Sequence, residues 1–375
     1  MERAIQAWLS RRTDIPEHIV SLTKKLQNTY VVYGSMILLP SDSIAELQSN
    51  PDLTNHDLQC LYEAIASHLK ITHIAVNRPI PLYNSTNGGD CTDENQENVL
   101  RSPSNFTPLF GDFGPSTCSN APTHADFDKA FWITAKQNGI YQTWAPRWTM
   151  FSRGNVSEKA RLLTLPSVVE AVEAGRHQVG AGFTAVDLYV GIGYFAFSYA
   201  KAGARKVLGW DLNAWSCEGL RRGAKANKWK AKVLCGDEDA GDVKGAVQDD
   251  EVSFLVFNES NERAAAKVER LRPVLPPVRH INCGMLPTSR GSWETAVQVL
   301  DARMGGWVHV HENFAVNDIE EKAGEVRQAF QKLLDHRGRG DRKVDLEHIN
   351  RLKSFAPGVM HVVLDLFIPP STDAD

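Results

Sequence analysis

The sequence has no hydrophobic run approaching the roughly 20 residues needed to cross a bilayer, and Met1–Trp8 lack the apolar stretch of a signal peptide. Its six cysteines are scattered, and none of them is spaced as Cys-x-x-Cys, which argues against zinc-site and disulfide patterns. We therefore expect a protein of a reducing compartment, the cytoplasm, with no metal and no contact with a membrane.

A large excess of charge of one sign is also lacking. The formal net charge of the 375 residues is −4 and the pI is about 6.3, which argues against binding nucleic acid through overall charge. Basic residues nevertheless gather in two places: Arg221, Arg222, Lys225, Lys228, Lys230 and Lys232, and again Arg337, Arg339, Arg342, Lys343, Arg351 and Lys353. For each group, a nucleic-acid surface and an ordinary solvated surface are alternatives.

A glycine-rich turn is present, but the third glycine of the dinucleotide-binding fingerprint is missing. Residues 185–189 predict a buried strand and residues 195–202 the helix that follows. Gly191 and Gly193 lie in the turn between them, where a ligand can come close to the backbone. Ala196 stands where the fingerprint requires glycine.

Two acidic residues accompany this turn. Asp187 precedes it, and Asp211 follows a second predicted strand, Lys206–Trp210, at the edge where carboxylates commonly bind ribose hydroxyls. An acidic residue at the position of Asp187 is not part of the dinucleotide fingerprint. Its carboxylate could instead attract the ammonium group of S-adenosylmethionine, a ligand that carries no phosphate. The pattern favours a site for S-adenosylmethionine, and a glycine-containing turn in another α/β enzyme is the alternative.

Three regions are expected along the chain. Residues 1–125 mix helical and strand patterns and predict a small α+β region, with a mobile polar loop near 83–105. Residues 126–165 connect it to a Rossmann-like domain over 166–375, whose parallel strands end in a strand pair at 348–353 and 361–367. This fold class is α/β, as in class I S-adenosylmethionine-dependent transferases.

The connecting region is rich in aromatic residues: Phe131, Trp132, Tyr141, Trp144 and Trp148. A packed core between domains and a surface that stacks nucleotide bases are the two alternatives.

The order of the later strands is ambiguous. Residues 232–234 predict a third strand, after which Asp237 would be placed to accept a hydrogen bond from an adenine amino group. Two apolar runs, 252–258 and 280–286, compete for the fourth strand.

Five motifs occur in the order of a known family: MFSRGNVSEK at 150–159, DLYVGIGYF at 187–195, NCGMLPTS at 282–289, HVHEN at 309–313 and KSFAP at 353–357. Over roughly residues 105–368, the chain resembles the family of tRNA guanine-37 N1-methyltransferases and wybutosine-synthesising proteins 2, and in particular its wybutosine branch.

The resemblance implies transfer of the 3-amino-3-carboxypropyl group of S-adenosylmethionine to C7 of 4-demethylwyosine, with release of 5′-methylthioadenosine. This tricyclic base lies at position 37 in the anticodon loop of phenylalanine tRNA. The sulfonium activates three adjacent carbons, so the pose of the co-substrate decides which one reacts. No metal is implied, and we expect a monomer.

The resemblance also places co-substrate contacts at Ser152, Lys159, Asp211, Asp237 and Glu238. Family members often have Glu at the position of Asp211 and Asn at that of Glu238, so a contact of Glu238 would use its backbone. For Lys159, the resemblance leaves open whether the lysine pairs with the methionine carboxylate or steadies the adenosine.

On the acceptor side, Asn282 and Pro287 are the candidates, because related methyltransferases hold the target base with an Asn-Pro-Pro-like segment there. The match selects 280–286 as the fourth strand and makes 252–271 an insertion to which no function is assigned. His309 and His311 are expected to be packed rather than catalytic, and no general base is assigned. A guanine-37 N1-methyltransferase and a non-catalytic tRNA-binding scaffold are the alternative functions.

Overall fold

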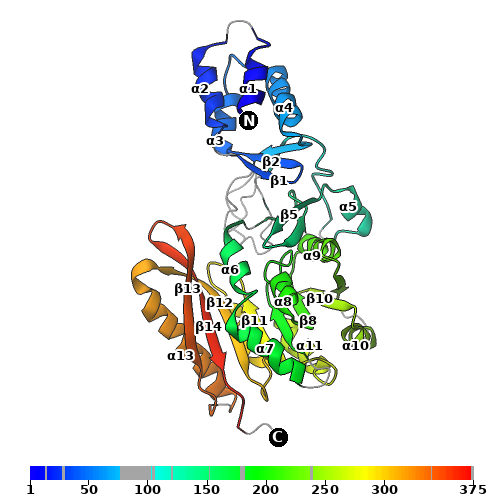
Figure 1. Ribbon diagram of the computed structural model, residues 1–375, viewed down its shortest axis with the longest axis vertical. Helices are drawn as coiled ribbons and strands as arrows, with labels where there is room; N and C mark the ends of the chain where they lie inside the picture. The colour runs from blue at the N-terminus through cyan, green and yellow to red at the C-terminus, as the bar shows by residue number, and fades with distance from the viewer. Residues whose placement is uncertain are drawn as a thin grey trace, which may run out of the picture. The chain divides into compact units, whose positions relative to one another are not determined.

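The computed structural model describes the chain except residues 13–14, 28–29, 77–102, 104–105, 120, 152, 178–181, 237–239, 339 and 373–375. It divides into two compact units (Figure 1): an N-terminal unit of Met1–Ala135 and Thr143–Phe151, and a C-terminal unit of Lys136–Gln142 and Ser152–Asp375. The hairpin of β5 (Ile133–Gln137) and β6 (Ile140–Trp144) has residues in both units, so the expected connecting region is shared between them.

The N-terminal unit combines a small four-stranded sheet with helices. Its sheet has the order β1-β2-β3-β4, and its helices include a long α4 whose first turn is closed by a reciprocal Thr54–Asp57 capping box. Residues 31–39 form two strands that are separated by a turn at Gly34. The loop expected near 83–105 lies, apart from Pro103, outside the described residues. The elements are α1 (Glu2–Leu9), α2 (Glu17–Lys25), β1 (Val31–Tyr33), β2 (Met36–Leu39), α3 (Ser41–Gln48), α4 (Asn55–Leu69), β3 (His73–Val76), β4 (Thr107–Phe110) and α5 (His124–Lys129).

The C-terminal unit is built on one eight-stranded sheet of order β13-β14-β12-β11-β7-β8-β10-β9. The strands from β12 to β9 run parallel to one another, and β14 pairs antiparallel with both β12 and β13. The strands are β7 (Thr184–Asp187), β8 (Lys206–Trp210), β9 (Lys230–Cys235), β10 (Val252–Asn258), β11 (Val278–Cys283), β12 (Gly306–Ala315), β13 (Asp345–Ala356) and β14 (Val359–Ile368).

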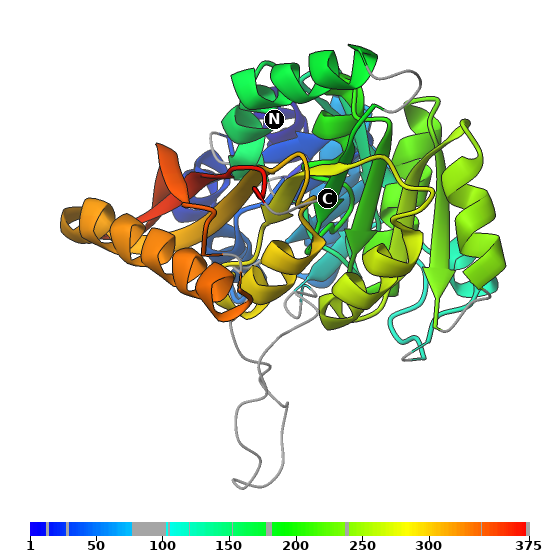
Figure 2. The same ribbon diagram turned by 90° about the horizontal axis from the view of Figure 1, so that it is seen from below.

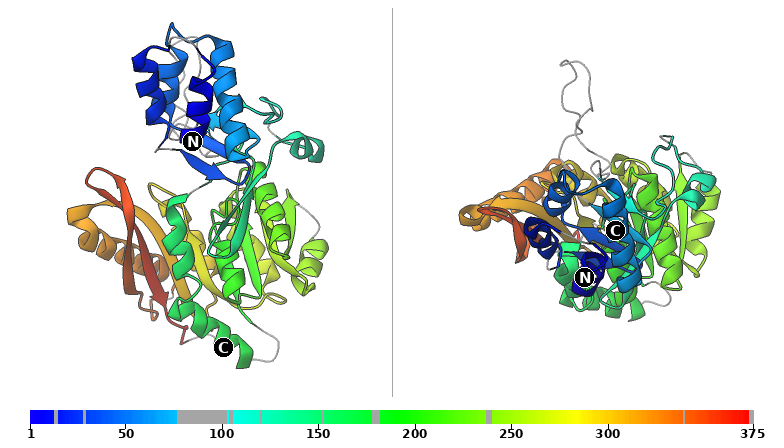
Figure 3. Two further views of the ribbon diagram at one scale, coloured as in Figure 1. Left: turned by 45° about the horizontal axis from the view of Figure 1, so that its top comes forward. Right: turned by 90° about the horizontal axis from the view of Figure 1, so that it is seen from above.

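Helices cover both faces of this sheet because successive side chains of each strand point to opposite faces (Figures 2 and 3). On β7, Ala185 belongs to a core with α7 (Pro166–His177), α8 (Ala196–Ala202) and α9 (Ala214–Ala226). The next residue, Val186, belongs to the core with α10 (Ala240–Gln248), α11 (Ala264–Leu271), α12 (Trp293–Val299) and α13 (Ile319–His336). In the described part of the chain, no helix is both long and apolar enough to span a membrane.

The insertion predicted over 252–271 is wrong. Strand β10 lies inside the sheet, with Val256 opposite Gly209 of β8 on one side and Val233 of β9 on the other. Both competing runs are therefore strands, and the sheet has one more parallel strand than expected. Strand β10 can lie inside the sheet because it is apolar on both faces, which a strand covered by helices on both sides requires. As a result β9 lies at the edge of the sheet, and the end of β10 is the neighbour of the end of β8.

If β10 is a central strand, Leu255→Ala should lower the free energy of unfolding by about 2–5 kcal/mol, because the fully buried Leu255 would leave a cavity. Leu212→Ala is the matched control, since Leu212 is 47% exposed and should cost little. Denaturant titration of the full chain measures both, and equal small losses would contradict a central position for β10.

Candidate functional site

The glycine turn leaves the carboxyl end of β7, in the middle of the sheet. Gly191 and Gly193 both have positive φ, at 54° and 90°. A Cβ atom on Gly193 would come within 2.7 Å of the Phe197 ring, and one on Gly191 within 2.9 Å of the Tyr194 ring. Both positions therefore require glycine for conformation and space, and the turn can present its backbone to a ligand.

Asp211 joins this turn to the end of β8. Its carboxylate accepts hydrogen bonds from the backbone N–H groups of Gly191 and Asn213, each at 2.8 Å. Burial raises the pKa of Asp211 to about 6, against the effect of these two hydrogen bonds. Each carboxylate oxygen has a second lone pair, so Asp211 can still accept hydrogen bonds from ribose hydroxyls.

Asp187, the last residue of β7, is fully buried. Its Oδ1 accepts hydrogen bonds from the side chain of Asn282 at 3.1 Å and from the backbone of Tyr189 at 3.2 Å. Its Oδ2 is also buried and has no hydrogen-bond partner in the part of the chain that the structure describes. Burial raises the pKa of Asp187 to about 7. A buried carboxylate with one unpaired oxygen fits a ligand that brings a positive charge.

Lys159 lies on α6 (Val156–Arg161) and is only 2% exposed, so it is not an ordinary surface lysine. Its Nζ donates to the side-chain oxygens of Gln137 and Gln142, at 2.5 and 3.2 Å, and lies 5.4 Å from the centre of the Tyr194 ring. The lysine is thus next to the glycine turn. Burial lowers its pKa to about 8.

A buried ionic network holds α6 against β14. Arg161 makes ion pairs of 2.6 Å with both Glu158 and Asp365, and Asp365 also accepts from His309 Nδ1 at 2.7 Å. Burial alone would raise the pKa of Asp365, but His309 and Arg161 hold it well below its usual range. This network places the helix that carries Lys159.

Of the two acceptor candidates, Asn282 is buried and uses both ends of its side-chain amide. The Nδ2 group donates to Asp187, and Oδ1 faces His311 Nε2 at 3.2 Å. Pro287 contributes its backbone oxygen, which accepts from the backbone N–H of Asn313 at 3.0 Å. The structure thus ties Asn282 to Asp187 of the glycine-turn site.

Asn313, near the end of β12, was not among the residues predicted from the sequence. Neither the nitrogen nor the oxygen of its buried amide group has a hydrogen-bond partner among the described residues. The HVHEN motif contains Asn313 and could have pointed to it.

The polar run after β10 was also missed. Asn258 donates to the backbone oxygen of Asp211 at 2.9 Å, and Asn261 to that of Leu188 at 2.8 Å. These amides therefore lie beside the ends of β8 and β7. A cluster of polar residues directly after an apolar strand was the available signal, but it was hidden because β10 was assigned to an insertion.

Three predicted contacts, Ser152, Asp237 and Glu238, lie outside the described residues, so their roles stay predictions. No group of three or more His, Cys, Asp or Glu side chains in the described ranges is arranged to hold a metal ion.

Two aromatic residues of the connecting region, Phe131 and Trp144, pack against other rings of the N-terminal unit. Trp144 stacks on Phe151 with ring centres 4.4 Å apart, and Phe131 stacks on His73 at 3.5 Å. Tyr141 is the exception, at 38% exposure. These contacts favour packing over base stacking for Phe131 and Trp144.

Ion pairs neutralise part of the two basic groups. Arg221 and Arg222 both pair with Glu218, at 2.6 and 2.7 Å, and Arg342 is buried. The free positive charge of these surfaces is therefore smaller than the sequence suggests.

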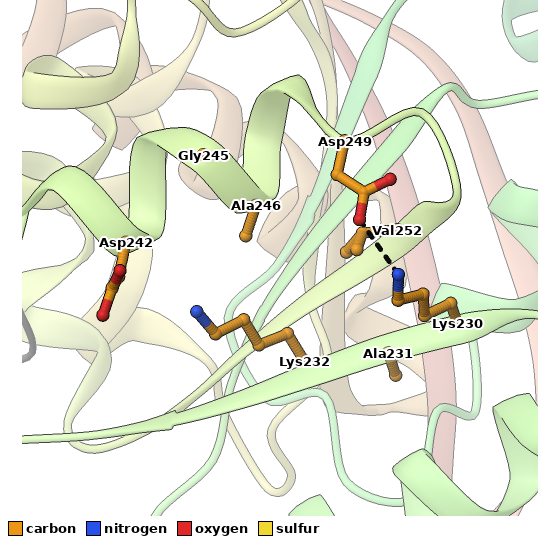
Figure 4. A pocket seen from close by; sticks show the side chains of 8 residues that line it. All are labelled: Lys230, Ala231, Lys232, Asp242, Gly245, Ala246, Asp249 and Val252. Carbon is orange, nitrogen blue, oxygen red and sulfur yellow. Dashed lines mark hydrogen bonds and ion pairs between the residues drawn. The ribbon is translucent and has the colours of Figure 1, made fainter.

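A hollow of about 440 Å³ lies between α10 and the first residues of β9 (Figure 4). Lys230 and Asp249 form a 3.0 Å ion pair on its wall, and the other lining residues are Ala231, Lys232, Asp242, Gly245, Ala246 and Val252. Because it includes the start of β9, the hollow is not at the carboxyl edge that carries the glycine turn.

No protein-family model matches the chain. The chain is 39% identical over 341 residues to tRNA wybutosine-synthesizing protein 2 of Schizosaccharomyces pombe, covering 90% of this chain and 72% of that protein. It is 32% identical over 331 residues to the Saccharomyces cerevisiae protein of the same name, covering 80% of this chain and 61% of that protein.

Solved structures of similar fold include P. horikoshii TYW2 in complex with MeSAdo, with a TM-score of 0.61, 18% identity and coverage of 99% of this chain and 100% of that one. M. jannaschii TYW2 in complex with AdoMet has a TM-score of 0.53 and 15% identity, with coverage of 91% and 100%. The complex of aTrm5 with tRNALeu has a TM-score of 0.51 and 15% identity, with coverage of 94% and 75%. The predicted fold class, that of an S-adenosylmethionine-dependent transferase, is confirmed, and the identity to the yeast relatives shows that the chain belongs to the tRNA wybutosine-synthesizing protein 2 family.

Proposed function

We propose that this protein transfers the 3-amino-3-carboxypropyl group of S-adenosylmethionine to C7 of 4-demethylwyosine at position 37 of phenylalanine tRNA. A carbon–carbon bond forms at C7, the carbon–sulfur bond of the donor breaks with its electron pair going to the sulfur of the departing 5′-methylthioadenosine, and C7 loses its proton to solvent. The main support is the 39% identity to a tRNA wybutosine-synthesizing protein 2 over 90% of the chain. We further propose that the protein acts as a cytoplasmic monomer on the anticodon loop.

Bound S-adenosylmethionine supplies a sulfonium that activates three neighbouring carbons, and the residues of the site select one of them. The unpaired Oδ2 of Asp187 fits the ammonium of the methionine arm, and the buried Lys159 fits its carboxylate. Both contacts would hold the arm that is transferred, and such positioning can account for a choice among similar carbons. Asp211, which closes the glycine turn, would bind the ribose.

The adenine contact is proposed at the end of β10. The position of Asp237 after the edge strand β9 first suggested that residue for the adenine, and the resemblance names Asp237 and Glu238 as co-substrate contacts. The fold also places Asn258 and Asn261 beside the ends of β8 and β7. In doubly wound sheets a nucleoside lies across the carboxyl ends of neighbouring central strands. This geometry favours the asparagines.

On the acceptor side, we propose that Asn313 takes part in binding the base. An amide offers one donor and one acceptor group in a plane, which suits the edge of a nucleobase. Its backbone N–H bonds to Pro287, so it is held next to the segment where the resemblance puts the acceptor.

The role of Asp187 predicts how binding of S-adenosylmethionine depends on pH. The ammonium requires an ionised carboxylate, and burial raises the pKa of Asp187 to about 7 in the free protein. Affinity should therefore be full just above this pKa, where the amine of the ligand is still protonated, and fall as the pH decreases through it, by up to about tenfold per pH unit. Asp187→Asn should weaken binding just above this pKa by about 1.5–3 kcal/mol and remove this step. Calorimetric titrations at several pH values test both, and parallel pH profiles of the two proteins would refute the assignment.

The adenine assignment predicts that Asn261→Ala lowers the affinity for S-adenosylmethionine by about 1–3 kcal/mol, as for a lost hydrogen-bond partner. Asp237→Ala is the matched comparison, because the position of Asp237 after β9 first suggested this residue for the adenine. A loss of affinity confined to Asp237→Ala would return the adenine contact to Asp237. A thermal melt of each variant separates loss of binding from loss of folding.

The reaction itself is tested by mass spectrometry of products. With phenylalanine tRNA that carries 4-demethylwyosine, we expect 5′-methylthioadenosine and a base heavier by the transferred group, in equal amounts. Formation of S-adenosylhomocysteine with unmodified tRNA would instead establish the guanine-37 methyltransferase. Binding of both ligands without either product would leave the tRNA-binding scaffold.

A further inference from the structure

Four buried polar side chains form a hydrogen-bonded row across the four adjacent strands β14, β12, β11 and β7. They are His361, His311, Asn282 and Asp187, and each is at most 1% exposed. Nε2 of His361 lies 3.0 Å from Nδ1 of His311, and Nε2 of His311 lies 3.2 Å from Oδ1 of Asn282. The Nδ2 atom of Asn282 lies 3.1 Å from Oδ1 of Asp187, which ends the row in the glycine-turn site.

The donors and acceptors of this row follow from the carboxylate. An ionised Asp187 only accepts, so Asn282 must present its NH₂ group to Asp187 and its oxygen to His311. That oxygen also only accepts, so His311 carries its proton on Nε2. A neutral imidazole has one N–H, so His311 Nδ1 accepts, and His361 must donate from its own Nε2. His361 Nδ1 then carries a lone pair and no proton. It is the one ring nitrogen of His311 and His361 without a hydrogen-bond partner among the described residues.

The surroundings keep both histidines neutral. Burial lowers the pKa of His311 and of His361 to about 3. The charged or titratable groups that act on His311 are His309, Asp365 and Arg161, while Lys353 and Glu158 act on His361. The Asp365 carboxylate is already paired with Arg161, so it does not offer His311 a free counter-charge.

We infer that His311 and His361 are positioning residues for the co-substrate: they fix the amide of Asn282 so that it donates to Asp187 and holds the carboxylate ionised, with its second oxygen free for the ammonium. The inference rests on the proposed role of Asp187. It also gives Asn282, a candidate for the acceptor side, a positioning role on the side of the co-substrate.

Removing the donor of His311 has a defined consequence. The Asn282 amide is then free to turn when Asp187 is protonated, and in the turned orientation its oxygen accepts a hydrogen bond from the carboxyl O–H, which stabilises the neutral acid. The pKa of Asp187 should rise, and binding of S-adenosylmethionine should weaken at a higher pH than in the wild type. A purely structural histidine would lower stability without moving this pH midpoint.

The test is the pH midpoint of S-adenosylmethionine affinity, measured by calorimetry on the full chain. We expect His311→Phe to move the midpoint upward by about one pH unit, which is about a tenfold loss of affinity below it. His311→Gln keeps a donor near the position of Nε2 and should restore the wild-type midpoint.

The matched control is His280→Phe. His280 is equally buried on β11, but its ring bonds to His309 and to the backbone of Ser167, not to Asn282. Its variant should keep the wild-type midpoint even if it is less stable. An unchanged midpoint in His311→Phe, or an equal shift in His280→Phe, would overturn the inference while leaving the proposed function intact. Wild-type affinity in Asp187→Asn would instead overturn the role of Asp187, and the inference with it.

A second measurement needs no variant that must fold. In ¹⁵N-imidazole NMR of the wild-type protein, His311 and His361 should both be neutral Nε2–H tautomers at about pH 8, where Asp187 is ionised. An Nδ1–H tautomer or a protonated ring at either position would contradict the row as assigned.

Discussion

The site at the carboxyl edge of the large sheet is arranged around a carboxylate, that of Asp187, in a position with almost no water. Asp187 ends the central strand β7, is fully buried and has one oxygen without a partner among the described residues. An isolated charge in such a place is strongly unfavourable, so it has to be balanced by hydrogen bonds and by a cation. The Asn282 amide and the backbone of Tyr189 provide the hydrogen bonds, and the ammonium of the co-substrate fits as the cation. The carboxylate is thus already oriented for the cation before the ligand binds.

The same need for compensation recurs around this carboxylate. Asp211 is balanced by two backbone N–H groups, and the buried Lys159 by two glutamine side chains. Further from the glycine turn, Arg161 is held between Glu158 and Asp365. The buried charges described here thus each meet defined partners, which leaves little freedom for the site to rearrange. A rigid site of this kind suits a reaction in which the pose of the donor decides the product.

Local features of the fold were predictable from the sequence because they depend on neighbouring residues. The strand at Lys206–Trp210 and the helix at Ala196–Ala202 follow from short apolar patterns, and Gly191 and Gly193 from the conformations that their turn requires. The order of strands was not predictable in the same way. An apolar run such as Val252–Asn258 shows that a strand is covered on both faces, but it contains no signal for which strands it pairs with.

The sequence by itself determined the fold class, the family motifs and the positions of Asp187, Asp211 and Lys159, because residue type and spacing along the chain are sufficient for these. Only the tertiary structure decided that β10 separates β8 from β9, and that Asn258 and Asn261 lie beside the site. It also decided the partners of Asn282, which come from Asp187 and His311, 95 and 29 positions away in the chain. The physical reason is that hydrogen bonds between strands depend on which strands become neighbours, and that choice is made by packing of the whole sheet.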